Sequence, residues 1–205
     1  KFNSQVAVRG NETAIIIEEN SIEVTYENLS SDVKKIAYHL WSCGVRNGDV
    51  VASQLPNGYE ALLMFLASTA IGIKYAPCAP DDPSTLERLA RCVPVKYLVL
   101  LEPYEHVDET VVAAIYMPQK LHGFEIETIP TSNSDQLAAS LLLLTSGSTG
   151  NPKIMSINCS RLWDSAEYFL SLYTTVNQSS RFWNYLPMSY LGGLFNLALI
   201  PIVAG

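Results

Sequence analysis

The sequence predicts an α/β fold in which helices cover both faces of a mostly parallel sheet. Short apolar segments with strand character alternate along the chain with segments whose apolar residues recur at helical spacing. Parallel pairing needs this alternation, because each crossover between parallel strands requires a covering element. The 205 residues, of which 48% are hydrophobic and 16% charged, are enough to bury a large core.

The first predicted elements are a hairpin and a long helix. Residues 13–18 and 22–25 are expected to form two short strands joined by a turn at residues 19–21. A helix follows, with Thr25 as its N-cap and Gly44 as its C-terminal stop. The apolar face of this helix consists of Leu29, Val33, Ile36, Ala37, Leu40 and Trp41.

The next elements continue the alternation of strands and helices. After a turn, residues 50–54 are expected to form a strand, and a helix over residues 61–71 is expected to begin with Asn57 as its N-cap. Further strands are predicted over residues 74–78, 96–101 and 139–145, with a helix over residues 84–92 between the first two.

Three other segments complete the predicted order. Residues 111–116 and 124–129 are weaker strand candidates in a stretch rich in acidic residues. Residues 191–204 are apolar but shorter than the roughly 20 residues that a bilayer requires, so they are expected to form a core element rather than a membrane span. If part of the surrounding core lies beyond Gly205, this segment is expected to be hidden by self-association or by folding back over the sheet.

Composition excludes several classes of function. The formal net charge is -7 and the 13 Lys and Arg residues are scattered, which argues against a nucleic-acid surface. The four cysteines form no C-x-x-C pair, and the three histidines lack ligand spacing, so no metal site is predicted. We interpret the thiols as reduced core residues and expect a cytoplasmic protein. The polar N-terminus does not resemble a signal peptide.

The most informative stretch is LLLLTSGSTGNPK, residues 141–153. In an open α/β sheet, ligands sit beyond the carboxyl ends of the strands, and a loop after a buried strand is held rigidly there. Gly147 and Gly150 allow positive φ and close approach of a ligand to the backbone, and Lys153 adds a positive charge. Hydroxyl donors come from Thr145, Ser146, Ser148 and Thr149. Backbone N–H groups and hydroxyls in such an arrangement are suited to phosphate oxygens.

The loop is not a Walker A motif. Pro152 precedes the lysine and Ile154 follows it, so no Ser or Thr stands after Lys153 to hold magnesium. The alternative is a surface turn rich in Ser and Gly. The strand before the loop and the Pro-Lys pair after it favour phosphate binding.

The segment TSGSTGNPK resembles the phosphate-binding loop of the adenylate-forming superfamily, which includes acyl- and aryl-CoA ligases, luciferases and nonribosomal peptide adenylation domains. Further segments resemble family motifs in order and spacing, namely VTYENL at 24–29, VRNGDVV at 45–51, IGIKYAPC at 71–78 and LPMSYLGGL at 186–194. Tyr190 stands where the family commonly has His, and Ile154-Met155 replaces the usual Gly-Val.

The resemblance implies that residues 1–205 are the N-terminal portion of an AMP-binding (adenylation) domain. The remainder of that domain and a small C-terminal domain are expected beyond Gly205. The intact enzyme would use ATP to convert a carboxylic acid into an acyl-adenylate and pyrophosphate. The acyl group would then pass to CoA or to the pantetheine of an acyl- or peptidyl-carrier protein. Ligands for Mg²⁺ are expected beyond Gly205, and the 205-residue chain alone is expected to be inactive.

By the same resemblance, Lys153 and Thr149 are assigned catalytic roles and Tyr190 the edge of the acid pocket. For Tyr190, a buried core tyrosine is the equally supported alternative. The nucleotide-binding set comprises Thr145, Ser146, Gly147, Ser148, Thr149, Gly150 and Lys153. Two other functions stay open at this point: a truncated nucleotide-binding or interaction module without catalysis, and a fragment with no activity of its own.

Overall fold

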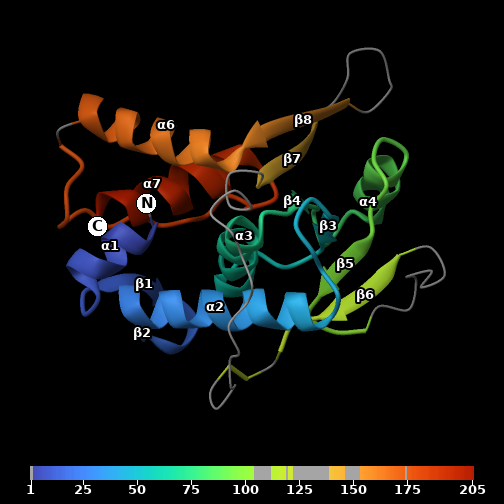
Figure 1. Ribbon diagram of the computed structural model, residues 1–205. Helices are drawn as coiled ribbons and strands as arrows, with labels where there is room; N and C mark the ends of the chain where they lie inside the picture. The colour runs from blue at the N-terminus through green and yellow to red at the C-terminus, as the bar shows by residue number, and fades with distance from the viewer. Residues whose placement is uncertain (1, 104–111, 119, 122–138, 146–152, 174) are drawn as a thin grey trace.

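The computed structural model describes residues 2–103, 112–118, 120–121, 139–145, 153–173 and 175–205. Among these residues, six strands form one sheet in the order β6-β5-β3-β4-β7-β8 (Figure 1). Neighbouring strands are parallel except β7 and β8, which are antiparallel. The strands are β3 Val50–Ser53, β4 Lys74–Pro77, β5 Tyr97–Leu100, β6 Ala113–Tyr116, β7 Ser140–Thr145 and β8 Lys153–Asn158. The predicted α/β class with a mostly parallel sheet is confirmed.

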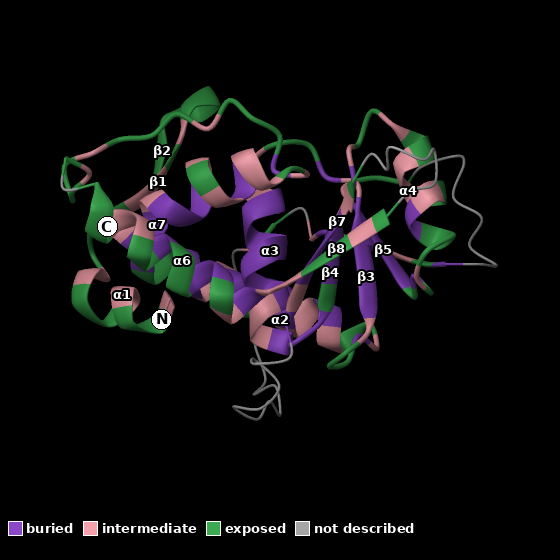
Figure 2. Cartoon of the chain, turned by 90° about the horizontal axis from the view of Figure 1, so that it is seen from above, coloured by how far each residue is buried: buried purple, intermediate pink, exposed green. Residues whose placement is uncertain are grey.

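Helices cover both faces of this sheet. Alternate strand residues point to opposite faces, so neighbouring residues of one strand pack under different helices. Val51 belongs to the core under α2 (Tyr26–Ser42) and α3 (Tyr59–Ile71), whereas its neighbour Ala52 belongs to the core under α4 (Pro83–Ala90). Helix α3 is buried on all sides, which explains its almost uniformly apolar sequence. Figure 2 shows buried residues along α3 and β3 and exposed residues on the outer helices.

The strand order explains why α3 and α4 lie on opposite faces. The chain runs from β3 to β4 in one direction across the sheet and returns past β3 to reach β5. Crossovers between parallel strands are almost always right-handed, so reversing the direction moves the connecting helix to the other face.

The N-terminal hairpin and the helix after it form as predicted. Strands β1 (Thr13–Ile17) and β2 (Ile22–Thr25) pair antiparallel, with a 3₁₀ turn at Glu18–Asn20 between them. The Thr25 side chain caps α2 by accepting a 3.2 Å hydrogen bond from the backbone N–H of Asn28. Just after α2, Gly44 has a φ of +94°, a conformation that favours glycine.

The later strands and helices that were predicted appear at the expected places, but the N-cap of α3 differs. Asn57 is not the N-cap of α3, because the helix starts at Tyr59 with Gly58 before it and has no side-chain cap. Strand β8 and the helices α1 (Phe2–Arg9) and α6 (Cys159–Leu172) were not predicted. The candidate strand over residues 111–116 corresponds to β6, and the candidate over residues 124–129 lies outside the described residues.

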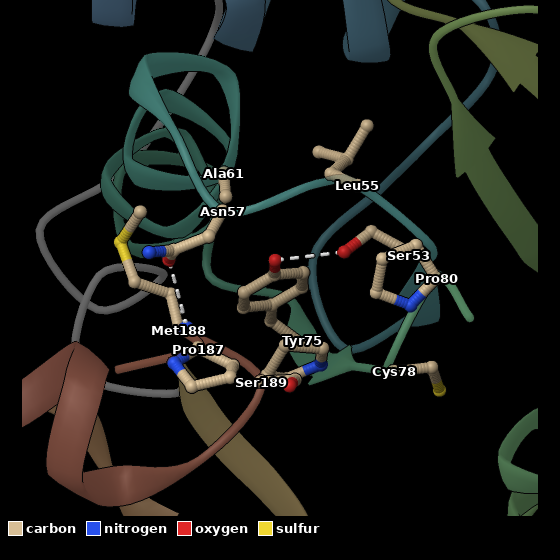
Figure 3. Close-up of a pocket in the computed structure, with 11 residues that line it drawn as sticks. Ser53, Leu55, Asn57, Ala61, Tyr75, Cys78, Pro80, Pro187, Met188 and Ser189 are labelled. Carbon is tan, nitrogen blue, oxygen red and sulfur yellow. Dashed lines mark hydrogen bonds between the residues drawn. The ribbon is translucent and has the colours of Figure 1, made fainter. Parts of the chain in front are cut away.

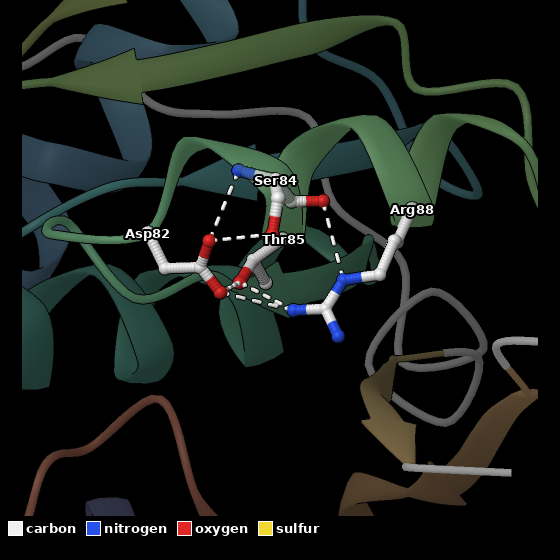
Figure 4. A network of polar contacts seen from close by, with 4 residues as sticks. All are labelled: Asp82, Ser84, Thr85 and Arg88. Carbon is white, nitrogen blue, oxygen red and sulfur yellow. Dashed lines mark hydrogen bonds and ion pairs between the residues drawn. The ribbon is translucent and has the colours of Figure 1, made fainter. Parts of the chain in front are cut away.

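Helix α4 is held at its start by a polar network (Figure 4). The carboxylate of Asp82 accepts hydrogen bonds from the backbone N–H and hydroxyl of Ser84 and from the hydroxyl of Thr85. Arg88, one turn later, donates to the same carboxylate at 3.0 Å. The network fixes the loop that connects β4 to α4.

The C-terminal segment folds back into the molecule, one of the two arrangements expected for it. A π-helix at Gly192–Leu199 (η2) continues into α7 (Ile200–Ala204). The side chains that it buries are Leu194, Ala198, Leu199, Ile200, Ile202 and Val203. Helix α7 packs against α6 (Cys159–Leu172) and lies beside α1 (Phe2–Arg9), so the chain ends are close together (Figure 1).

Only two of the four cysteines are core residues. Cys78 and Cys159 are buried, whereas Cys43 and Cys92 are exposed, so the prediction that all four thiols lie in the core is wrong. Cys43 and Cys92 follow the ends of α2 and α4, where the chain reaches the surface. In the part of the chain that the structure describes, no helix has the length and apolarity needed to cross a bilayer.

Candidate functional site

The two ends of the LLLLTSGSTGNPK segment lie on neighbouring antiparallel strands, β7 and β8. Leu141, Leu142 and Leu143 of β7 are buried, as predicted. Thr145 at the end of β7 pairs with Lys153 at the start of β8. The Thr145 hydroxyl donates a 3.3 Å hydrogen bond to the Lys153 carbonyl oxygen. The two predicted residues that flank the loop are therefore brought together, and both are exposed.

The other predicted residues of this loop lie outside the described residues: Ser146, Gly147, Ser148, Thr149 and Gly150. Their attachment points nevertheless fix where the loop leaves the sheet. Strand β7 is parallel to β4, so Thr145 is at the same edge as the carboxyl ends of β3 and β4. This edge is where open α/β sheets bind ligands.

The strand order changes direction between β3 and β4. Their carboxyl ends lead to α3 and α4 on opposite faces, which creates a crevice between the two connections. A small cavity lies here (Figure 3), with a volume of about 20 Å³, enough for a single water molecule. Its lining comes from the ends of β3 and β4, the start of α3 and the segment 187–189.

The polar groups at this cavity are neutral. The hydroxyls of Ser53 and Tyr75 are 2.8 Å apart and share a buried hydrogen bond. Burial raises the pKa of the Tyr75 hydroxyl above its ordinary value. Burial also raises the pKa of the Cys78 thiol to about 12. The cavity thus offers no charge for binding an ionic ligand, and Cys78 is not activated as a nucleophile.

Tyr190 lies on the turn that follows this cavity-lining segment. Its ring is 60% exposed, so the alternative of a buried core tyrosine is wrong. Its backbone N–H donates to the Pro187 carbonyl oxygen at 3.1 Å, and its carbonyl oxygen accepts from the Leu194 N–H at 3.1 Å. Tyr190 is therefore held by its backbone while its side chain is largely exposed. Among the described contacts, none joins it to Thr145 or Lys153.

Asn57 is a residue of this edge whose role was misassigned from the sequence. Its carboxamide bonds to the backbone of Asn184 and Met188, far along the chain. Its place in QLPNG, directly after a buried strand, could have indicated a carboxyl-edge position. Its partners, more than a hundred residues later, could not be inferred from local spacing.

Comparison with known proteins identifies the family to which the chain belongs. The family model described as AMP-binding enzyme matches residues 2–205. The chain belongs to this family. Because the match covers nearly the whole chain, the resemblance drawn from the sequence motifs is confirmed.

Similarity to individual relatives is consistent with membership of the AMP-binding family. The chain is 32% identical over 161 residues to the nonribosomal peptide synthetase sidE of Aspergillus fumigatus, covering 75% of this chain and 7% of that protein. It is 26% identical over 220 residues to a CoA ligase of Gibberella moniliformis, covering 100% of this chain and 36% of the relative. The chain thus spans well under two thirds of either protein.

A solved structure shares the fold. The o-succinylbenzoate CoA synthetase MenE of Bacillus subtilis, in complex with the acyl-adenylate intermediate OSB-AMP, superimposes with a TM-score of 0.81 at 22% identity. The match covers 98% of this chain and 53% of the synthetase. At 22% identity, this similarity establishes the fold of the AMP-binding family member but not its substrate.

The described residues of this AMP-binding family member contain no set of side chains suited to binding a metal ion. Within them, no group of three or more His, Cys, Asp or Glu side chains could hold a metal ion. We therefore assign no residue here as a magnesium ligand.

Proposed function

We propose that the protein activates a carboxylic acid with ATP. An oxygen of the carboxylate attacks the α-phosphorus, forming a new P–O bond while the bond to the pyrophosphate oxygen breaks. The products are an acyl-adenylate and pyrophosphate. Family membership over residues 2–205 and similarity to a CoA ligase and a nonribosomal peptide synthetase support this reaction class.

The observation that carries the proposal is the Thr145–Lys153 pair at the carboxyl edge of the sheet. The pairing of β7 with β8 fixes Thr145 and Lys153, the two residues from which the loop leaves the sheet. Negative charge increases on the pyrophosphate as it leaves, so preorganised N–H, O–H and ammonium groups stabilise the transition state where that charge develops. We assign this role to Lys153 and Thr149, with further donors from Thr145, Ser146, Gly147, Ser148 and Gly150.

Tyr190 is assigned to the edge of the acid pocket. Its exposed ring and backbone-anchored position are compatible with contact to a small organic acid. A tyrosine offers both an apolar ring face and a hydroxyl that can donate or accept a hydrogen bond.

In the second step, a thiol takes the acyl group. The sulfur attacks the carbonyl carbon of the acyl-adenylate, the carbon–oxygen bond to AMP breaks, and the thiol proton is released. CoA and a carrier-protein pantetheine are the two acceptor classes suggested by the names of the relatives. Mg²⁺ would neutralise phosphate charge, with ligands outside the residues described here.

The proposal includes the domain organisation. Residues 1–205 form the N-terminal portion of the adenylation domain, and the remainder of the activity depends on further chain. A nucleotide-binding module without catalysis is the alternative function.

Pyrophosphate exchange distinguishes the two. Full-length protein should incorporate labelled pyrophosphate into ATP only when a cognate carboxylic acid is present. Hydroxylamine added to the reaction should trap the acyl-adenylate as a hydroxamate that contains the same acid. ATP binding without exchange, across a broad panel of aliphatic, aromatic and amino acids, would favour the non-catalytic module.

A further inference from the structure

The segment from Asn184 to Tyr190 is held by side chains rather than by regular secondary structure. None of these residues belongs to a helix or strand. Their backbone N–H and C=O groups therefore need partners outside a regular hydrogen-bond ladder. Tyr190 is the last residue of this segment, so the contacts that hold the segment also set where the Tyr190 ring lies.

Asn57 supplies two of these partners. Its Oδ1 accepts a 3.1 Å hydrogen bond from the backbone N–H of Met188. Its Nδ2 donates a 3.4 Å hydrogen bond to the carbonyl oxygen of Asn184. Figure 3 shows the Asn57 side chain directed toward Met188. A carboxamide offers both a donor and an acceptor, whereas a carboxylate only accepts and an alanine does neither.

The opposite side of the segment rests on η2. The Asn184 side chain donates a 3.2 Å hydrogen bond to the Gly193 carbonyl oxygen. A Cβ at Gly193 would lie 2.4 Å from the carbonyl oxygens of Leu186 and Pro187, so the two backbones are in direct contact. The segment is thus enclosed between Asn57 and η2.

Asn57 itself has a rigid support. The chain leaves β3 with the Gln54 N–H bonded to the Val99 carbonyl oxygen at 3.0 Å, and Leu55 is then buried. This places Asn57 at the crevice between β3 and β4, the usual ligand position of such sheets. Here the protein's own segment 187–189 lies in the crevice and leaves only the small cavity described above.

We infer that Asn57 is a positioning residue for the acid-binding edge. It holds segment 184–188 through both ends of its carboxamide and thereby sets the position of Tyr190. This inference rests on the proposed function, because that proposal assigns Tyr190 to the acid pocket. It adds a residue from the other end of the chain to the determinants of acid affinity.

Hydrogen exchange tests the structural part in full-length protein. In Asn57→Ala, the Met188 amide loses its acceptor, so peptides covering residues 184–190 should exchange faster by on the order of tenfold, the effect of one lost hydrogen bond. Asn57→Asp keeps the acceptor and should leave Met188 protected. Asn3→Ala, an exposed asparagine on α1, is the matched control. Unchanged exchange in Asn57→Ala overturns the inference.

Kinetics test the functional part in the same variants. Asn57→Ala should raise the KM for the carboxylic acid by on the order of tenfold, with the KM for ATP unchanged. The KM of Asn57→Asp for the carboxylic acid should lie between that of the wild type and that of Asn57→Ala. An equal rise in both KM values would indicate general damage and contradict a positioning role. If wild-type protein shows no acid-dependent pyrophosphate exchange, the proposed function fails. The hydrogen exchange of the Met188 amide still decides whether Asn57 holds the segment.

Discussion

The hydroxyl of Tyr26 donates a hydrogen bond of 3.0 Å to the carbonyl oxygen of Ile202. Both residues are 1% exposed, so no water replaces this bond. The carbonyl belongs to the last turn of α7, where carbonyl groups have no partner within the helix. Gln5 of α1 donates in the same way to the Val203 carbonyl oxygen at 3.0 Å. Side chains from α1 and α2 thus supply hydrogen-bond donors to two carbonyl groups of α7.

Tyr26→Phe is expected to destabilise the protein by about 1–3 kcal/mol, because it leaves the buried Ile202 carbonyl without a partner. The free energy of unfolding from urea titration measures the effect. Tyr168→Phe is the control, since that ring is 67% exposed. Equal stability of the two variants would contradict the importance of this bond.

Gly193→Ala is expected to destabilise the protein by about 1–3 kcal/mol, because the new methyl group overlaps with backbone that cannot rotate away. Gly58→Ala is the matched control, since its nearest contact would be an ordinary 3.5 Å from the Glu60 carboxylate. Thermal or urea unfolding compares them. If Gly193→Ala is as stable as Gly58→Ala, segment 184–190 does not pack against η2 as described.

The Asp82 network predicts a dependence of stability on pH. Hydrogen bonds from Ser84 and Thr85, followed by the nearby Arg88 charge, lower the pKa of the Asp82 carboxyl. A lowered folded-state pKa stabilises the protein above the unfolded value of about 3.9, and this contribution is lost as the pH falls through the folded-state pKa. Asp82→Asn should therefore be less stable than wild type at pH 7.

At acidic pH the difference between Asp82→Asn and wild type should shrink, because the wild-type carboxyl is then also neutral. Urea titrations across the acidic range follow this change. Asp81→Asn, at the exposed neighbouring carboxylate, provides the control. A difference that stays constant down to the acid limit would mean that the charge of Asp82 contributes nothing.

Thiol labelling should separate the four cysteines. Burial raises the pKa of Cys78 and of Cys159 to about 12, so at neutral pH almost no reactive thiolate is present at either. Cys43 and Cys92 are exposed and should react with N-ethylmaleimide in the native protein. Peptide mapping before and after denaturation gives the pattern. Native labelling of Cys78 as fast as Cys43 would contradict the described core.

Substitutions in the loop test its chemical role in full-length protein. Lys153→Ala and Thr149→Val should each slow adenylation by on the order of ten- to a thousandfold, if they remove groups that stabilise the leaving pyrophosphate. Lys74→Ala is the matched control, because Lys74 begins β4 at the amino edge of the sheet. Single-turnover formation of the acyl-adenylate measures the step. Unchanged rates in both loop variants would make the loop structural.

Local patterns in the sequence were sufficient for elements whose signals are complete within a short window. Helix α2 has a period of apolar residues, a capping threonine and a terminal glycine, and all three appear in the structure. The buried strand β7 followed from a run of four leucines.

Other features depend on partners that no local pattern contains. Strand β8 mixes exposed and half-buried residues without alternation, so its sequence carries no clear strand period. Asn57 has the residue type of a helix cap, yet its carboxamide bonds across 127 and 131 positions of sequence. The loop residues of the candidate site were predicted from motif chemistry and stay a prediction.

The bonds from Gln5 and Tyr26 to α7 have a consequence for how the protein is made. Helix α1 buries no residue of its own completely, and its Phe2 ring packs near Trp163 of α6. Its hydrogen-bonding partner, the Val203 carbonyl, is 198 positions later in sequence. Contacts of such long sequence separation form late, because closing the intervening loop has a high entropic cost. Helix α1 also contacts α2, which is close in sequence. During synthesis on the ribosome, the Gln5 and Tyr26 bonds to α7 should therefore form only after α7 has emerged from the exit tunnel, long after the hairpin β1–β2 and helix α2 can pair locally.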